Sequence, residues 1–228
     1  MIISVHQPNY LPWIGYFRKI AISDAFIFFD DIQFEKGGYT NRVRIRMGDE
    51  PNWLTQPVLK KDILNKKIFD VKIDGATDWK SKHLKSFEFN YKKSNFYNEA
   101  IEILKSILSF QSDSISDFNI NAVEIILNKL KINTKIFRSS ALDYGLQSSP
   151  SEKLASIVIS LGGKVYLSGS GGKKYNDLEV FSRNHICLKY DDWTPPVYNQ
   201  GHPFSHGLSI IDGIAHLGID DIKKALFP

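Results

Sequence analysis

The amino-acid sequence predicts an α/β protein with a Rossmann-like, mostly parallel sheet, a β-hairpin excursion and a helical insertion. Short apolar runs of strand length alternate with helical spacings of apolar residues near the N-terminus and again in the last third of the chain. Residues 78–130 between them carry only helical periodicities. With no repeat or low-complexity tract, these segments indicate a single domain, 1–228, with a helical insertion at about 78–130.

The first third opens with a strand, a loop, a helix and a second strand. Residues 1–5 are typical of a short buried strand, because prolines soon after it prevent a central strand from continuing. Residues 14–21 have helical spacing, and the run AFIFFD at 25–30 predicts the next strand. Residues 33–58 alternate about a Gly-Asp-Glu-Pro turn and predict the hairpin, with Arg42, Arg44 and Arg46 sharing one face.

The remaining elements follow in order. A strand is expected at 68–74, and the insertion is expected to hold helices at 79–90, 95–110 and 115–130. In the last third we expect strands at 135–140, 164–169 and 186–193, helices at about 149–161 and 171–185, and a final helix from Leu208 or Ser209. Parallel strands need right-handed crossovers, and ligands of such sheets bind beyond the carboxyl ends of the strands.

Charge and composition limit the classes of partner. The 228 residues include 29 lysines and arginines against 25 acidic residues, a formal charge of +4, and the isoelectric point is about 8.9. The paired lysines are scattered along the chain and form no single stripe. This mild excess suits an anionic ligand at least as well as a nucleic acid.

The single cysteine, Cys187, excludes an intramolecular disulfide and a cysteine metal cluster. It lies in an apolar strand segment, where we expect an inert, buried thiol. The N-terminus has no basic n-region, and no apolar run approaches the roughly 20 residues that span a bilayer. We therefore expect a cytoplasmic protein without a membrane span.

The stretch HQPNYLPWIGYF follows the first strand and mixes polar, aromatic and proline residues. Its aromatic side chains have the spacing of core residues, whereas His6, Gln7 and Asn9 bring three hydrogen-bonding side chains to the end of a strand. Such groups need partners, and a bound ligand is a common one. Gly15 at the start of a helix allows a ligand to approach backbone N–H groups closely.

Acidic and glycine-rich segments follow two other strands. Of the pair Asp30-Asp31, at most one side chain faces a cleft, where it could act as a base, bind a metal or accept a ribose hydroxyl; a cap or turn is the alternative. The stretch YLSGSGGKKY at 166–175 can aim successive N–H groups at an anion, although it matches no named nucleotide motif.

Histidines 202 and 206 are four residues apart, a spacing that would suit zinc on a helix. Pro203 and Gly207 argue against a helix there, so we favour a polar loop and assign no metal ligand.

At HQPNYLPWIGYF, FDDIQFEKGGYTNR, YLSGSGG and PVYNQ…FSHGLSIIDGIAHLG, the sequence resembles the WbqC-like protein family, found in bacterial O-antigen and related surface-polysaccharide gene clusters. The resemblance implies action in lipopolysaccharide biosynthesis on a nucleotide-linked amino sugar, by acylation of its amine with a group such as glycyl. Matching the motifs implies roles in the site for His6, Gln7, Asn9, Tyr10, Asp31, Asn41, Arg42, Ser168, Gly169, Tyr198, Gln200 and Asp212.

The opening also resembles, more distantly, the nucleotidylyltransferase and class I synthetase superfamily, whose H-x-G-H histidines hold ATP phosphates. The aligned residues here are Trp13-Ile14-Gly15-Tyr16, so only Gly15 carries over. An acyl adenylate made with ATP, a charged tRNA and a thioester all stay open as the acyl donor.

We predict an amino-sugar N-acyltransferase or ATP-dependent amide ligase. His6 or Asp31 would act as general base, while Arg42, Arg44 and the glycine-rich loop would hold a diphosphate. Two alternatives stay open. One is a non-catalytic nucleotide-sugar or glycan-binding protein, and the other is a tRNA-contacting aminoacyl transfer protein that uses the arginine face of the hairpin.

Overall fold

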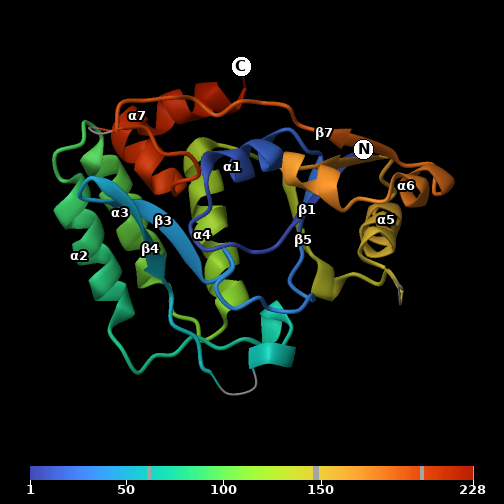
Figure 1. Ribbon diagram of the computed structural model, residues 1–228, viewed down its shortest axis with the longest axis horizontal. Coiled ribbons are helices and arrows are strands. Elements are labelled where there is room, and N and C mark those ends of the chain that lie inside the picture. Colours follow the sequence, from blue (N-terminus) through green and yellow to red (C-terminus); the bar gives the residue numbers. More distant parts are fainter. Residues whose placement is uncertain (61–62, 146–148, 201–202, 228) are drawn as a thin grey trace. The chain divides into compact units, whose positions relative to one another are not determined.

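The structure is a computed structural model that describes residues 1–60, 63–145, 149–200 and 203–227 (Figure 1). The chain divides into two compact units, each assembled from three segments. The sheet unit contains Met1–Gln7, Arg18–Asp30 and Thr134–Thr194, and the helical unit contains Pro8–Phe17, Asp31–Asn133 and Pro195–Pro228. The single domain, 1–228, stays a prediction.

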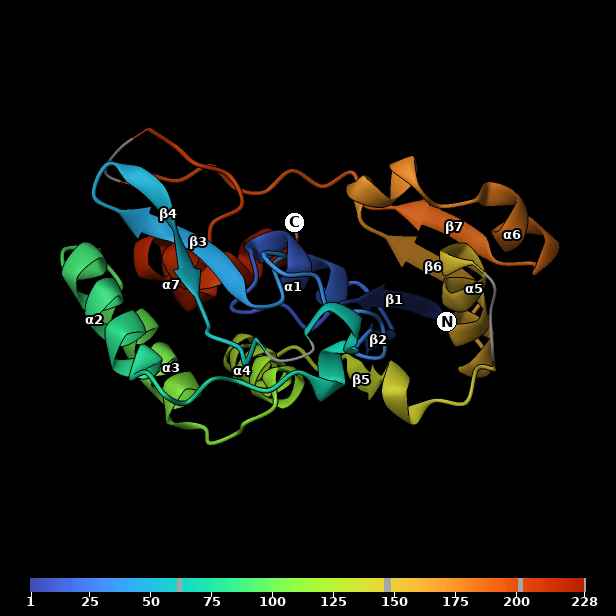
Figure 2. The same ribbon diagram turned by 60° about the horizontal axis from the view of Figure 1, so that its bottom comes forward.

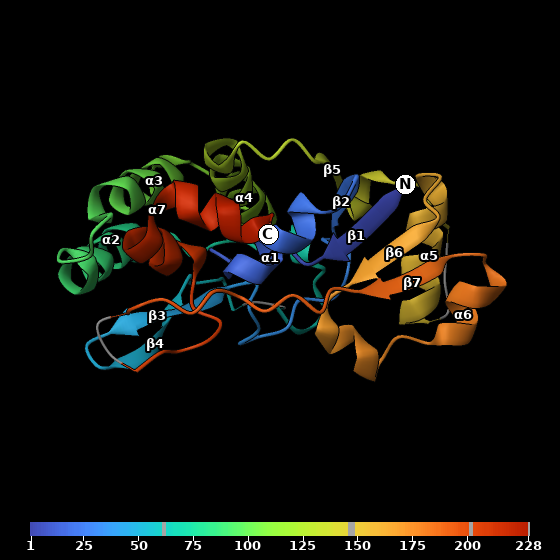
Figure 3. The same ribbon diagram turned by 90° about the horizontal axis from the view of Figure 1, so that it is seen from above.

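The sheet unit is built on five parallel strands in the order β5-β2-β1-β6-β7, which lie side by side in Figure 3. Their bounds are β1 Ile2–His6, β2 Ala25–Phe28, β5 Lys135–Arg138, β6 Val165–Ser168 and β7 Cys187–Tyr190. Strand β1 is central. The chain adds β2 and β5 on one side of it and then β6 and β7 on the other side. The sheet therefore has a topological switch point between β1 and β6, and the predicted fold class is confirmed.

Apolar side chains on one face of this sheet form the core of the unit. Val5 and Ile27 of the strands pack in one cluster with Ile157 of α5, Pro150–Ser160, and Phe181 of α6, Leu178–Arg183. Alternation along a strand puts its neighbours on the opposite face. There the Ser23 hydroxyl donates to Ser4 Oγ at 2.8 Å, so the segment after α1, Ile14–Ala21, is tied to β1.

The two central strands pair along only part of their length. The ladder between β1 and β6 contains the pairs Ile2↔Val165 and Ile3↔Tyr166. Beyond that point β1 continues to His6 alongside β2, and β6 continues to Ser168 alongside β7. The carboxyl halves of β1 and β6 are thus not joined to each other by ladder hydrogen bonds, and this separation lies at the switch point.

The helical unit combines the predicted hairpin with long helices, and Figure 2 shows the hairpin on one side of them. The hairpin strands are β3 Arg42–Met47 and β4 Glu50–Thr55, and the helices are α2 Trp79–Tyr91, α3 Tyr97–Ser109, α4 Ile115–Leu130 and α7 Ile210–Leu226. Helix α3 packs against both α2 and α7. Asp78 and Ser114 cap α2 and α4 by accepting backbone N–H groups, as expected for residues that favour the N-cap position.

Three predictions about individual segments are wrong. The helix expected at about 171–185 is a 3₁₀ turn, Ser170–Lys174, followed by the shorter helix α6, Leu178–Arg183, because the glycines and Asn176 interrupt it. Residues 68–74 do not form a strand: Ile68–Asp70 is a short 3₁₀ turn, and Lys72 and Ile73 make only isolated bridges, to Ser114 and Val58. The alternating apolar side chains of this segment are buried one by one, although no neighbouring strand in the described chain pairs with it. Cys187 is exposed, because it begins β7 at the edge of the sheet.

A buried histidine joins the opening loop to the helices of the helical unit. The Tyr10 hydroxyl lies 2.8 Å from His83 Nδ1, and His83 Nε2 lies 3.1 Å from the carbonyl oxygen of Thr55. Because a carbonyl only accepts, Nε2 carries the proton and Nδ1 accepts from Tyr10. Burial lowers the pKa of His83 to about 4, which agrees with a neutral ring.

This histidine makes stability depend on pH. The unfolded chain takes up a proton at His83 below about pH 6.5, whereas the folded chain resists protonation until about pH 4. The free energy of unfolding should therefore fall as the pH drops through this window, with about 3 kcal/mol from this residue at pH 4. Urea denaturation at a series of pH values measures the effect.

The matched variants are His83→Gln, which removes the titration, and His185→Asn at an exposed position. His83→Gln should flatten the fall relative to the wild type, and His185→Asn should leave it unchanged. Identical pH profiles for His83→Gln and the wild type would contradict this assignment.

Candidate functional site

The helical unit contains a pocket of about 850 Å³ beside the end of α2 and the segment 197–200. Its positively charged side chains are Arg46, Lys92 and Lys93, and its amides are Asn90, Asn95, Asn199 and Gln200. Tyr91, Tyr198 and His216 also line it. None of the described lining residues is acidic. A volume of this size accommodates a small organic ligand, and the lining favours one that is anionic and rich in hydroxyl groups.

A buried carboxylate organises this pocket. Asp212, in the first turn of α7, is completely buried, and both of its oxygens accept hydrogen bonds from tyrosine hydroxyls. Tyr198 donates to Oδ1 at 2.6 Å, and Tyr91 donates to Oδ2 at 2.8 Å. Burial raises the pKa of Asp212, and the two tyrosine hydrogen bonds act in the opposite direction. Asp212 thus fixes two tyrosines that line the pocket.

Arg46 of β3 connects the same group to the loop before α7. Its backbone N–H donates to the Tyr91 hydroxyl at 2.7 Å. Its guanidinium is buried and donates to Gln200 Oε1 at 2.8 Å and to the carbonyl of Pro203 at 2.7 Å. The Arg46 charge therefore holds the loop in place and compensates for the nearby carboxylate, which leaves Lys92 and Lys93 as the exposed cations of the pocket.

His216 also lines the pocket, and an imidazole can take up or release a proton. It lies one helical turn after Asp212 on α7, and its ring centroid is 6.0 Å from that of Tyr198. Burial lowers the pKa of His216, the Asp212 charge raises it, and the Arg46 charge lowers it further. The net shift is downward, so at pH 7 the ring is neutral and able to accept a proton.

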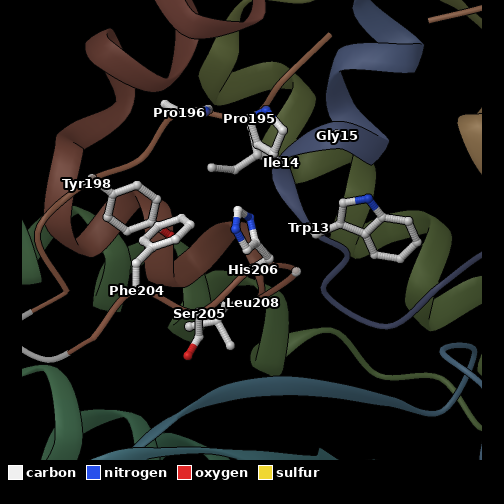
Figure 4. A pocket seen from close by; sticks show the side chains of 11 residues that line it. Trp13, Ile14, Gly15, Pro195, Pro196, Tyr198, Phe204, Ser205, His206 and Leu208 are labelled. Atoms are coloured by element: carbon white, nitrogen blue, oxygen red, sulfur yellow. The ribbon is translucent and has the colours of Figure 1, made fainter. Parts of the chain in front are cut away.

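A second, narrow pocket of about 40 Å³ shares Tyr198 with the first. Figure 4 shows the ring of His206 at its centre, with Tyr198 and Phe204 on one side and Trp13 on the other. The rings of Phe204 and His206 meet edge to face at 4.8 Å. Gly15 also lines this pocket, so two residues that the sequence predicts for the site, Gly15 and Tyr198, line the same pocket.

In the helical unit Tyr198 and Gln200 line the large pocket, and both donate hydrogen bonds to the buried Asp212 behind them. Other residues that the sequence predicts for the site lie elsewhere in this unit. Tyr10 is buried against His83, Arg42 stacks over the Trp53 ring at 4.0 Å, and Asp31 is partly exposed after β2.

Asn9 and Asn41 are two residues of the helical unit that the sequence predicts for the site, and each has a side-chain oxygen that can still accept a hydrogen bond. Asn9 and Asn41 are buried, and in the described part of the chain each has an Oδ1 atom without a hydrogen-bond partner. The side chain of Asn119 donates to the carbonyls of the residues that precede them, Pro8 and Thr40, at 2.8 and 2.7 Å. Asn119 therefore draws the two predicted segments toward each other.

The sheet unit holds the remaining predicted residues: His6, Gln7, Ser168 and Gly169. His6 Nδ1 lies 3.3 Å from the carbonyl of Gln7, so Nδ1 carries the proton of the neutral ring. Burial, and then the charge of Lys19, lower the pKa of His6 well below its ordinary value. Ser168 is buried at the end of β6, and the glycine-rich segment after it forms the 3₁₀ turn Ser170–Lys174.

Asp30 has a structural role at the end of β2. It is fully buried, and the hydroxyl of Ser140 donates to Oδ2 at 2.9 Å, while the Ser140 N–H donates to Oδ1 at 3.0 Å. Asp30 therefore ties the turn Ser139–Ala141 to the end of β2.

Sequence reasoning did not assign Tyr91, Lys92, Lys93 or His216 to the site. The spacing of Asp212 and His216, four residues apart at the start of a predicted helix, was the available signal for His216, because such residues share one helix face. Within the described residues no group of three metal-binding side chains occurs, although His202 lies outside them. No helix in the described part of the chain has the length and apolar character to cross a membrane.

The fold and the pocket together define an α/β protein with a doubly wound parallel sheet and a polar, positively charged ligand pocket in a helical unit. Residues 7–224 match the model of the WbqC-like protein family, and the chain belongs to this family. It is similar to the uncharacterized protein Rv1507c of Mycobacterium tuberculosis (strain ATCC 25618 / H37Rv), with 34% identity over 192 residues, 84% of this chain and 82% of the relative. No solved structure gives a significant match.

The two tyrosines that hold Asp212 should differ in their effect on stability. Tyr91→Phe removes one donor to the carboxylate and also the acceptor of the buried Arg46 N–H. We expect a loss of about 3 kcal/mol, whereas Tyr198→Phe, at a partly exposed ring that water can reach, should cost about 1 kcal/mol. Urea denaturation at pH 7 measures both. Equal losses in the free energy of unfolding, or a larger loss for Tyr198→Phe, would show that Tyr91 does not connect Asp212 to the Arg46 N–H.

Proposed function

We propose that the protein is a cytoplasmic enzyme of surface-polysaccharide sugar biosynthesis that transfers an acyl group, such as glycyl, to the amine of a nucleotide-linked amino sugar. The observation that carries the proposal is the 850 Å³ pocket lined by cations and amides around the buried Asp212. Membership of the WbqC-like family supports the polysaccharide context.

The lining of the pocket suits the parts of such a substrate. Lys92 and Lys93 are exposed at the pocket and can pair with the diphosphate. Amide side chains, such as those of Asn90 and Asn199, can donate to and accept from sugar hydroxyls. The aromatic surface of Tyr198 can cover an apolar face of the sugar ring.

His216 is placed to serve as general base. An amine attacks an acyl carbonyl only as the neutral form, and it must lose a proton as the C–N bond forms. A neutral His216 can accept this proton, and the negative charge of Asp212 one turn earlier on α7 stabilises the resulting imidazolium. The bond from the carbonyl carbon to the leaving group then breaks, and the leaving group retains the electron pair.

The leaving group identifies the acyl donor. An acyl adenylate formed with ATP releases AMP, a charged tRNA releases its 3′ hydroxyl, and a thioester releases a thiol. The assay therefore offers each of these donors with purified amino-sugar nucleotides carrying uridine or thymidine diphosphate, and detects the amide product by mass spectrometry.

We expect His216→Gln to bind the nucleotide sugar normally but to lower kcat by about 10²–10⁴-fold, the range for loss of a general base. In the wild type, the acid limb of kcat should have its midpoint below 6.5, because burial lowers the pKa of His216. Lys92→Met and Lys93→Met should instead raise KM. The control is His185→Asn, at an exposed position in the sheet unit.

Two results would overturn acyl transfer at this pocket. Binding of the nucleotide sugar without turnover of any donor would favour the non-catalytic binding protein. Turnover that survives His216→Gln would move the chemistry elsewhere, and His6→Ala and Asp31→Asn in the same assay test the two bases that the sequence predicts. Steeply salt-dependent RNA binding in place of sugar binding would favour the tRNA-contacting alternative.

A further inference from the structure

A buried lysine lies where the central strands of the sheet unit separate. Lys19, on α1, is 6% exposed, and its Nζ donates to the carbonyl oxygen of Val5 at 3.0 Å. The backbone carbonyls of Ile2 and His6 accept hydrogen bonds from the β2 side, from Asp24 and Phe29. Because carbonyls alternate along a strand, that of Val5 points toward β6. The ammonium of Lys19 therefore takes the place of a ladder donor at the switch point.

This ammonium has few polar partners for a buried cation, and its nearest aromatic contact is the Phe26 ring, whose centroid lies 6.0 Å from Nζ. It has three N–H donors, and within the described residues the Val5 carbonyl is its one hydrogen-bond acceptor and no ion pair includes it. The acids at this edge of the sheet are engaged elsewhere: Asp30 accepts from Ser140, and Asp191 pairs with Arg18 at 3.3 Å. Burial lowers the pKa of Lys19 to about 7, which agrees with a charge that the protein alone leaves uncompensated.

The residues around Lys19 have the character of an anion site. His6 ends β1 on the same face of the sheet, and its pKa responds to the charge of Lys19, which places the two basic groups near each other. The glycine-rich turn Ser170–Lys174 follows β6 at the same end of the sheet. A Cβ atom at Gly172 would collide with the side chains of Ser168 and Asn176, so this turn keeps a compact shape.

An open acceptor lies just after this turn. Asn176 donates to Ser168 Oγ at 3.0 Å, and its buried Oδ1 has no hydrogen-bond partner among the described residues. An amide oxygen in this position can accept from a ligand hydroxyl or a protonated phosphate oxygen.

We propose that the separation between the carboxyl halves of β1 and β6 binds a phosphate or polyphosphate anion, with the Lys19 ammonium as its principal charged contact. In doubly wound sheets this position, outside the carboxyl ends of the strands at the switch point, is where ligands bind. The site belongs to the sheet unit and does not rest on the acyl transfer proposed for the pocket of the helical unit.

The test measures binding of inorganic pyrophosphate, ATP and adenosine to the full chain by calorimetry. The variants are Lys19→Met, which keeps the length of the side chain without its charge, and Lys164→Met, an exposed lysine just before β6 at the opposite edge of the sheet. We expect Lys19→Met to weaken pyrophosphate binding by about 10- to 100-fold, the effect of losing a charged hydrogen bond. Lys164→Met should bind as the wild type does.

Thermal unfolding separates a ligand site from a structural lysine. If Lys19 is kept for an anion, Lys19→Met should unfold at a higher temperature than the wild type in the absence of ligand, because an uncompensated buried charge is removed. A lower melting temperature with unchanged pyrophosphate binding would overturn the proposal and make Lys19 a structural donor to β1.

The wild type alone gives an independent result if a variant fails to fold. Pyrophosphate should raise its melting temperature in a concentration-dependent way, and failure of both pyrophosphate and ATP to do so at millimolar concentration would overturn the proposal. Stronger binding of ATP than of pyrophosphate would identify a nucleotide as the source of the phosphate, and equal binding a free polyphosphate. The double variant Lys92→Met/Lys93→Met, which removes the exposed cations of the pocket in the helical unit, should retain pyrophosphate binding at Lys19, so this proposal can stand where acyl transfer fails.

Discussion

The helical unit depends on one constraint, the pairing of a carboxylate that water does not reach. Asp212 is fully buried, and a buried ionised carboxylate is stable only when hydrogen-bond donors and positive charge surround it. The donors come from α2 and from the segment before α7, as Tyr91 and Tyr198. Arg46 supplies the positive charge, and its backbone N–H links Tyr91 to β3. Segments distant in sequence are therefore fixed around one group, and the polar pocket forms at its edge.

The sheet could be predicted from the sequence because strands of a parallel sheet are covered on both faces and therefore appear as short, continuous apolar runs. The runs at β1, β2 and β6 have this character, and the hairpin is marked by alternation about a turn. Residues 68–74 carry the same alternation, yet they form a 3₁₀ turn and isolated bridges. Alternation records which side chains are buried, and it does not record whether a neighbouring strand is present.

The polar site was less predictable for a related reason. Motif matching singled out Tyr198, Gln200 and Asp212; in the structure Tyr198 and Gln200 line the large pocket and donate to Asp212. Arg46 and Lys19 stand in amphipathic segments where a long charged side chain usually reaches solvent. Both are buried, at 4% and 6% exposure. Their burial depends on carbonyl and amide oxygens from other segments of the chain, which a single sequence does not reveal.

Arg46 and Lys19 show two different ways to bury a positive charge. Arg46 has several acceptors, so its charge is satisfied by the protein itself. Lys19 has one hydrogen-bond acceptor, the Val5 carbonyl. Its pKa is about 7 in the folded chain, against an ordinary 10.5, so between these two pH values the unfolded chain binds a proton at Lys19 that the folded chain does not. The free energy of unfolding therefore falls as the pH drops from 10.5 toward 7, and the whole loss due to Lys19 is present at neutral pH and below. An anion that binds the charged form raises this pKa and offsets the cost, so ligand binding and folding of the sheet unit are linked through one side chain.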